Sequence, residues 1–108
     1  MAVTILETAS VRFDDIYSSS RERWGEAQAE RYLAGLFSAI EGLEDGRTKS
    51  RPVPAAFGVL GFVARFEHHY IYWRRLKDGR VGVVSILHER MHQSGRLRRE
   101  FGRWPEED

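Results

Sequence analysis

A chain of 108 residues accommodates one domain with a modest hydrophobic core, and we expect residues 1–108 to form that single domain. Its 42% hydrophobic and 31% charged residues argue against extensive disorder, and the lack of cysteine excludes disulfides, thiolate nucleophiles and thiolate zinc sites. The net charge of +1 conceals an acidic half, residues 1–46, and a basic half, residues 47–108, which favours an acidic or phosphate-bearing partner.

The first half of the chain predicts a short strand followed by two helices. Ala2 to Leu6 is rich in β-branched residues and too short for a helix, so we expect a strand there. Ser10 is the expected N-cap of a helix whose apolar side chains recur at helical spacing as far as Trp24. Gly25 ends this helix, and a second periodic run ends near Asp45-Gly46. Together they predict an amphipathic helical hairpin lying on a flat surface.

The second half changes to a β pattern after a basic loop at residues 47–56, where two prolines exclude a helix and a central strand. Three strands are expected next, at Val59 to Phe66, His69 to Leu76 and Val81 to Leu87, with a turn at Asp78-Gly79. Because consecutive strands with short connections usually pair, we expect a three-stranded antiparallel meander. A helical hairpin covering one face of this sheet makes an α+β domain.

The C-terminal stretch from Gln93 to Trp104 carries four arginines, with Leu97 and Phe101 one helical turn apart. This spacing predicts a short basic amphipathic helix, or a tail that becomes ordered on a partner.

Two histidine motifs invite a metal-site interpretation that the sequence does not support. His88-Glu89-Arg90-Met91-His92 matches the zinc protease pattern, in which two histidines one helical turn apart bind Zn²⁺. The pattern here follows a strand, and Arg98 stands where the longer form of the motif has a third histidine. His68 and His69 are adjacent, and adjacent strand residues point to opposite faces and cannot bind one ion together, so we expect this pair to close the turn between two strands. We therefore expect no metal site and no cofactor.

Several motifs resemble the ParE/RelE superfamily of bacterial toxins, over residues 3 to 97. The first helix carries Phe13-Asp14-Asp15-Ile16-Tyr17, and Ala29 with Tyr32 is similar to an Ala-x-x-Tyr pattern of the second family helix. His69 to Arg74 resembles the Tyr-x-Ile-x-Tyr-Arg strand. Ile86 to His92 is similar to the ParE ending Ile-Leu-His-x-Arg-Met-Asp, except that His92 replaces the usual aspartate.

The resemblance implies a cytoplasmic toxin of a type II toxin–antitoxin system that inhibits DNA gyrase by binding, without covalent chemistry. It also implies a ParD-like antitoxin that is acidic and partly disordered, and a toxin–antitoxin hetero-oligomer with no membrane partner. The expected gyrase contacts are His88, Arg90, Met91 and His92. The expected antitoxin contacts belong to the basic C-terminal stretch and are Arg96, Leu97, Arg98, Arg99 and Phe101.

Two other functions are compatible with the sequence. RelE-like members of the superfamily cleave messenger RNA on the ribosome, which requires cations at the phosphate and a group that accepts the 2′-hydroxyl proton. The residues available for that chemistry are Arg65, Arg74, His88 and Arg90. The second alternative is a protein-binding module without catalytic activity.

Overall fold

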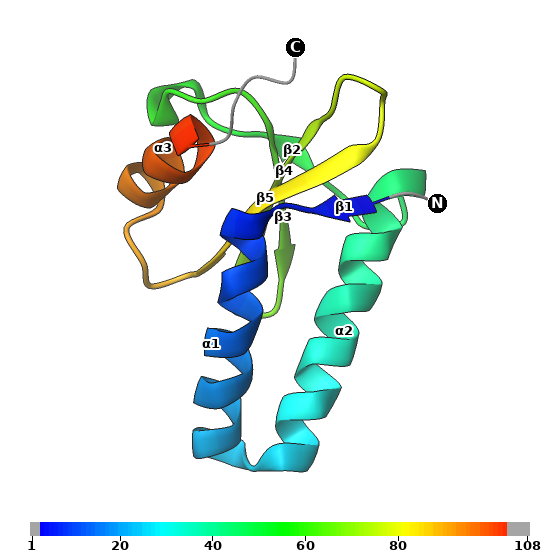
Figure 1. Ribbon diagram of the computed structural model, residues 1–108, viewed down its shortest axis with the longest axis vertical. Helices are drawn as coiled ribbons and strands as arrows, with labels where there is room; N and C mark the ends of the chain where they lie inside the picture. Colours follow the sequence, from blue (N-terminus) through cyan, green and yellow to red (C-terminus); the bar gives the residue numbers. More distant parts are fainter. Residues whose placement is uncertain (1–2, 104–108) are drawn as a thin grey trace.

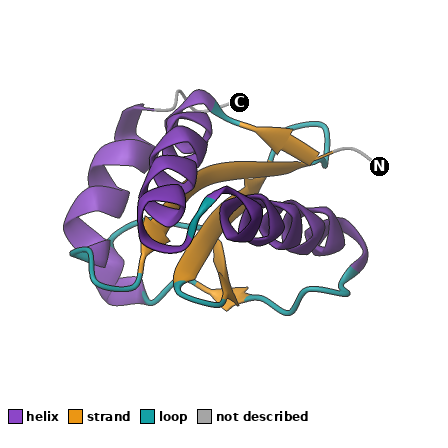
Figure 2. Cartoon of the chain, turned by 90° about the horizontal axis from the view of Figure 1, so that it is seen from below, coloured by secondary structure: helices purple, strands orange, loops and turns teal. Residues whose placement is uncertain are grey.

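The computed structural model describes residues 3–103, and of residues 101–103 it describes the backbone alone. The helices are α1 (Glu7–Trp24), α2 (Glu26–Asp45), the short 3₁₀ helix η1 (Ala55–Phe57) and α3 (Gln93–Arg103). The strands are β1 (Val3–Ile5), β2 (Arg51–Pro52), β3 (Phe62–Phe66), β4 (His69–Arg75) and β5 (Val81–His88). Figure 1 and Figure 2 show the strands gathered into one twisted sheet with the helices packed around it. The predicted α+β fold is confirmed.

The sheet contains the predicted antiparallel meander and one additional strand at each edge. Its order is β1-β5-β4-β3-β2, and β3, β4 and β5 pair antiparallel. The N-terminal strand β1 pairs in parallel with β5, so that Val3 lies opposite Val81. Strand β2 lies within residues 47–56, where a loop was expected. The proline of β2 is tolerated because β2 lies at the edge of the sheet. Its missing backbone N–H therefore leaves no neighbouring strand without a hydrogen-bond donor.

The helical hairpin follows β1 with almost no connection, which corrects the expected start of the first helix. Helix α1 begins at Glu7 and not after Ser10, and the Ser10 N–H donates to the carbonyl oxygen of Leu6 at 2.9 Å. The Thr8 hydroxyl also donates to the carbonyl oxygen of Val84, which ties the first turn to β5. Gly25 separates the helices with φ +94°, a backbone conformation that only glycine adopts without strain.

Each face of the sheet packs against its own helical layer. The hairpin face buries side chains of α1 and α2 against β4 and β5, with Leu36, Ile71 and Ile86 nearly or completely inaccessible. On the opposite face, α3 and η1 cover Tyr72, Leu87 and their neighbours. Within residues 3–103, no helix combines the length and apolar character needed to cross a membrane.

Candidate functional site: a histidine-lined pocket and the strand exit

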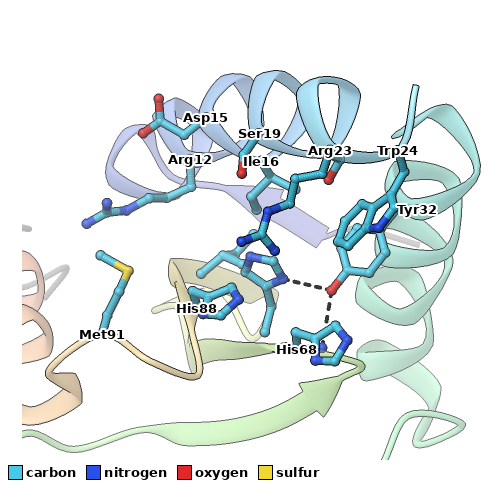
Figure 3. Close-up of a pocket in the computed structure, with 13 residues that line it drawn as sticks. Arg12, Asp15, Ile16, Ser19, Arg23, Trp24, Tyr32, His68, His88 and Met91 are labelled. Carbon is cyan, nitrogen blue, oxygen red and sulfur yellow. Dashed lines mark hydrogen bonds between the residues drawn. The ribbon is translucent and has the colours of Figure 1, made fainter. Parts of the chain in front are cut away.

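A pocket of about 300 Å³ opens where the far part of the hairpin overhangs the end of the sheet (Figure 3). Helix α1 provides one wall and the turn between β3 and β4, together with the end of β5, provides the other. The lining side chains are Arg12, Asp15, Ile16, Ser19, Ser20, Arg23, Trp24, Tyr32, His68, His69, Ile86, His88 and Met91.

Tyr32 of α2 connects the hairpin to the two adjacent histidines. Its hydroxyl oxygen lies 2.7 Å from Nδ1 of His69 and accepts the backbone N–H of His68 at 3.2 Å. Burial lowers the pKa of His69 to about 4, assisted by the nearby His88 and His68, so this imidazole is neutral at neutral pH. Burial also raises the pKa of Tyr32, which keeps the phenol protonated as a donor.

The two other histidines of the pocket, His68 and His88, belong to a partly exposed polar cluster. Nδ1 of His68 lies 3.0 Å from the carboxylate of Glu89, whose other oxygen accepts from Arg65 at 2.5 Å. The hydrogen bond from His68 lowers the pKa of Glu89, and the charge of Arg65 lowers it further. Burial lowers the pKa of His88, and its Nδ1 accepts the backbone N–H of Arg90 at 3.1 Å.

His68 and His69 lie where the turn between β3 and β4 meets the strand, as expected, but strand alternation does not place them on opposite faces. His68 lies in the turn and only His69 belongs to β4, so strand alternation does not separate them. Both line the same pocket, and neither this pocket nor the role of Tyr32 was recognised from the sequence. The contact between Tyr32 and His69 spans 37 positions, and no local pattern encodes it.

The expected gyrase contacts follow the end of β5. His88 is the last residue of that strand and lines the pocket, whereas Arg90 and His92 are exposed. Met91 is half-buried and packs against the second core. Because His88 ends a strand and His92 precedes α3, the two histidines do not share a helical face. Among the described residues, no three histidine or acidic side chains are grouped so that they could hold a metal ion.

The expected antitoxin contacts lie on α3, which is docked on the sheet. Leu97 is completely buried, whereas Arg98 and Arg99 are exposed and Arg96 is half-buried. The guanidinium of Arg98 donates to the carbonyl oxygen of Phe57 at 3.2 Å, joining α3 to η1. Of these contacts, only the side chain of Phe101 lies outside the described residues.

A buried polar network fixes the inner face of α3. Glu100 has 7% of its surface exposed, and its carboxylate accepts hydrogen bonds from the Ser85 hydroxyl of β5 and the Arg12 guanidinium of α1. Three elements distant in sequence therefore meet at one carboxylate. This network has no counterpart in the sequence analysis, where Glu100 was not singled out.

The four residues considered for RNA cleavage come from different faces of the sheet, although Arg65 and His88 both border the cluster around Glu89 and His68. By strand alternation and register, Arg65 and Arg74 belong to the α3 face of the sheet, whereas His88 belongs to the hairpin face. The guanidinium of Arg65 already binds Glu89 and the Tyr70 hydroxyl. Arg90 lies on the exposed turn after β5.

Comparison with known proteins gives a consistent result. The profile of the family described as "ParE toxin of type II toxin-antitoxin system, parDE" matches residues 3–93. The chain is similar to "Toxin ParE" of Escherichia coli, with 38% identity over 78 residues that cover 72% of this chain and 75% of the relative. It is also similar to "Toxin ParE1" of Mycobacterium tuberculosis strain H37Rv, with 28% identity over 86 residues that cover 77% of this chain and 84% of the relative.

Proposed function

The chain belongs to the ParE toxin family of type II toxin–antitoxin systems, and we propose on that premise that it inhibits DNA gyrase. ParE-like toxins, which the sequence resembles, act on this enzyme. The observation that supports the proposal most directly is that the family match extends through β5 and the turn after it. That turn presents Arg90 and His92 to solvent, beside the half-buried His88 and Met91.

We propose that inhibition occurs by binding and not by RNA cleavage. A guanidinium such as that of Arg90 binds a carboxylate or a phosphate through two parallel hydrogen bonds. Cleavage would require free cations and a proton acceptor around one phosphate, whereas the guanidinium of Arg65 already binds Glu89 and the Tyr70 hydroxyl. Tyr72, also on the α3 face, is an unsuitable base because burial raises its pKa to about 12.

A supercoiling assay with purified gyrase and relaxed plasmid tests this function. We expect the wild-type chain to inhibit supercoiling, and Arg90→Gln to raise the half-inhibitory concentration about tenfold or more, since a hydrogen bond to a charged group is worth about 1.5–3 kcal/mol. Arg80→Gln is the matched control, because Arg80 is an exposed arginine on the turn before β5. This control should inhibit within about twofold of the wild-type chain.

The same preparations should be incubated with ribosome-bound message. Cleavage of the message together with undisturbed supercoiling would replace gyrase inhibition with the RelE-like activity. Equal loss of inhibition in Arg90→Gln and Arg80→Gln would leave gyrase as the target but remove the turn after β5 as the contact.

We further propose that a cognate acidic antitoxin neutralises the toxin and that its carboxylates approach the outer surface of α3. Arg98 and Arg99 are exposed there and Arg96 is half-buried, so all three can attract an acidic chain. Leu97 is fully buried against the sheet and is inaccessible while α3 stays docked. The arginines should therefore accelerate association, and apolar contacts elsewhere should supply most of the affinity.

Stopped-flow association with a purified acidic, ParD-like antitoxin tests this surface. The double reversal Arg96→Glu/Arg99→Glu leaves Arg98, which anchors η1, in place. We expect the association rate to fall about tenfold or more at low salt and the dissociation rate to change little. An unchanged association rate would show that the antitoxin approaches another surface.

A further inference from the structure

The pocket beneath the hairpin presents hydrogen-bond donors from its histidine side. Nδ1 of His88 accepts the Arg90 backbone N–H, so the hydrogen of the neutral imidazole is on Nε2. Nδ1 of His69 is 2.7 Å from the Tyr32 hydroxyl, while the alternative acceptor of that hydroxyl, the Phe66 carbonyl oxygen, is 3.5 Å away. The shorter distance assigns the phenol hydrogen to His69 Nδ1 and therefore leaves an N–H at Nε2.

The charged side chains of the pocket leave one cation without a carboxylate partner. Arg12 is paired with Glu100, and Asp15 points to the side of α1 away from the histidines (Figure 3). Arg23 extends toward the imidazoles in the same view. Its only described partner is the ring of Trp24, 5.6 Å away. The guanidinium can therefore accept an anion without losing an ion pair.

Apart from Ser19 and Ser20 of α1, the remaining lining is largely apolar. Ile16 and Ile86 are buried residues that line the pocket, and Met91 lies on the side away from Trp24 (Figure 3). The indole of Trp24 also lines the pocket, and 55% of that residue's surface is exposed, so it is accessible to a ligand. A volume of about 300 Å³ with apolar walls and a few convergent polar groups is typical of small-ligand sites.

We propose that this pocket binds a small organic acid, an aromatic ring bearing one carboxylate. The ring lies between Ile16, Ile86 and the Trp24 indole, and the carboxylate accepts hydrogen bonds from Arg23 and from Nε2 of His88. The carboxylate of this ligand complements the hydrogen-bond donors and the positive charge of the Arg23 guanidinium. A cationic ligand would instead be repelled by that guanidinium. The inference goes beyond the proposed function, because binding to the isolated chain depends on neither gyrase nor antitoxin.

A ¹H–¹⁵N NMR titration with phenylacetate tests the site, and phenylacetamide supplies the same ring without the charge. We expect phenylacetate to saturate in the millimolar range and to shift the Trp24 indole N–H most. We also expect phenylacetamide to bind at least fivefold more weakly, because a charged acceptor forms the stronger hydrogen bonds.

The variant Arg23→Gln should weaken phenylacetate binding at least fivefold and leave phenylacetamide unaffected. Arg21→Gln is the matched control, since Arg21 is also an exposed arginine of the last turn of α1 but lies over the Tyr17 ring outside the pocket. It should bind both probes as the wild-type chain does. Equal affinity for the two probes, equal loss in both variants, or shifts centred away from Trp24 would overturn the proposal.

Discussion

Deleting either partner of the pair between Arg12 and Glu100 should destabilise the protein strongly. The side chains are only 14% and 9% exposed, and the pair joins α1 to α3. Removing one partner of a buried ion pair costs about 3–5 kcal/mol, because the remaining charge is then separated from both water and a counterion. We expect Arg12→Met and Glu100→Leu each to lower the free energy of unfolding by about 3 kcal/mol, near the lower limit because Arg12 keeps some contact with water.

The double variant distinguishes the ion pair from simple packing. Replacing both charges by apolar side chains removes the desolvation penalty as well as the attraction, so Arg12→Met/Glu100→Leu should be at least about 2 kcal/mol more stable than the sum of the single losses predicts. Urea denaturation followed by circular dichroism measures each value. Arg80→Met is the control, since the pair between Arg80 and Asp78 is 46% and 56% exposed and should be worth at most about 1 kcal/mol.

Hydrogen exchange of the α3 amides supplies the readout specific to this network. Relative to the wild-type chain, each single variant should accelerate amide exchange more in α3 than in β4, because Glu100 holds α3 against Ser85 and Arg12. Strictly additive losses, or a loss in Arg80→Met equal to that in Arg12→Met, would refute the reasoning. Burial of Leu97 would then account for the docking of α3 by itself.

Three further predictions concern the hairpin and its contact with the sheet. Tyr32→Phe should lower the free energy of unfolding by about 1–3 kcal/mol in urea denaturation, because it leaves Nδ1 of His69 and the His68 N–H without their partner. The pKa of His69 is about 4 in the folded chain, below its ordinary value of 6.5. Between these pH values the unfolded chain binds a proton at His69 that the folded chain does not, so the free energy of unfolding falls as the pH decreases from 6.5 to 4. Between pH 7 and pH 5 the wild-type chain should lose about 2 kcal/mol more than His69→Gln, measured in the same way. Gly25→Ala should cost about 1–3 kcal/mol, read as a lower thermal midpoint, because φ at this position is +94°.

The local sequence was sufficient for the elements whose pattern repeats within a few residues. The apolar side chains of the second helix recur at helical spacing, and two of them, Leu36 and Ile40, are buried on one face of α2. The turn at Asp78-Gly79 separates β4 from β5, as expected. Errors occurred where a distant contact decides the boundary. Ser10 has the chemistry of an N-cap, but α1 starts earlier because the chain turns directly from β1 and Thr8 binds β5.

The candidate site was predictable only in part. The ending from Ile86 to His92 is continuous in the sequence, so its likeness to ParE was recognisable without a structure. The pocket combines α1, α2, β4 and β5, and its members become neighbours only after the hairpin has packed on the sheet. Alternation along a strand could not place His68, because His68 belongs to the turn that precedes β4.

The sequence by itself determined the order and type of the longer helices and strands, the acidic and basic halves and the family, because each depends on residues close together along the chain. Tertiary structure alone decided that β1 pairs in parallel with β5, that Leu97 is a core residue and that Glu100 binds Arg12 and Ser85. The physical reason is that apolar burial and ion pairing depend on which surfaces meet. The contact between Arg12 and Glu100 spans 88 positions of the chain and exists only when α3 lies on the sheet.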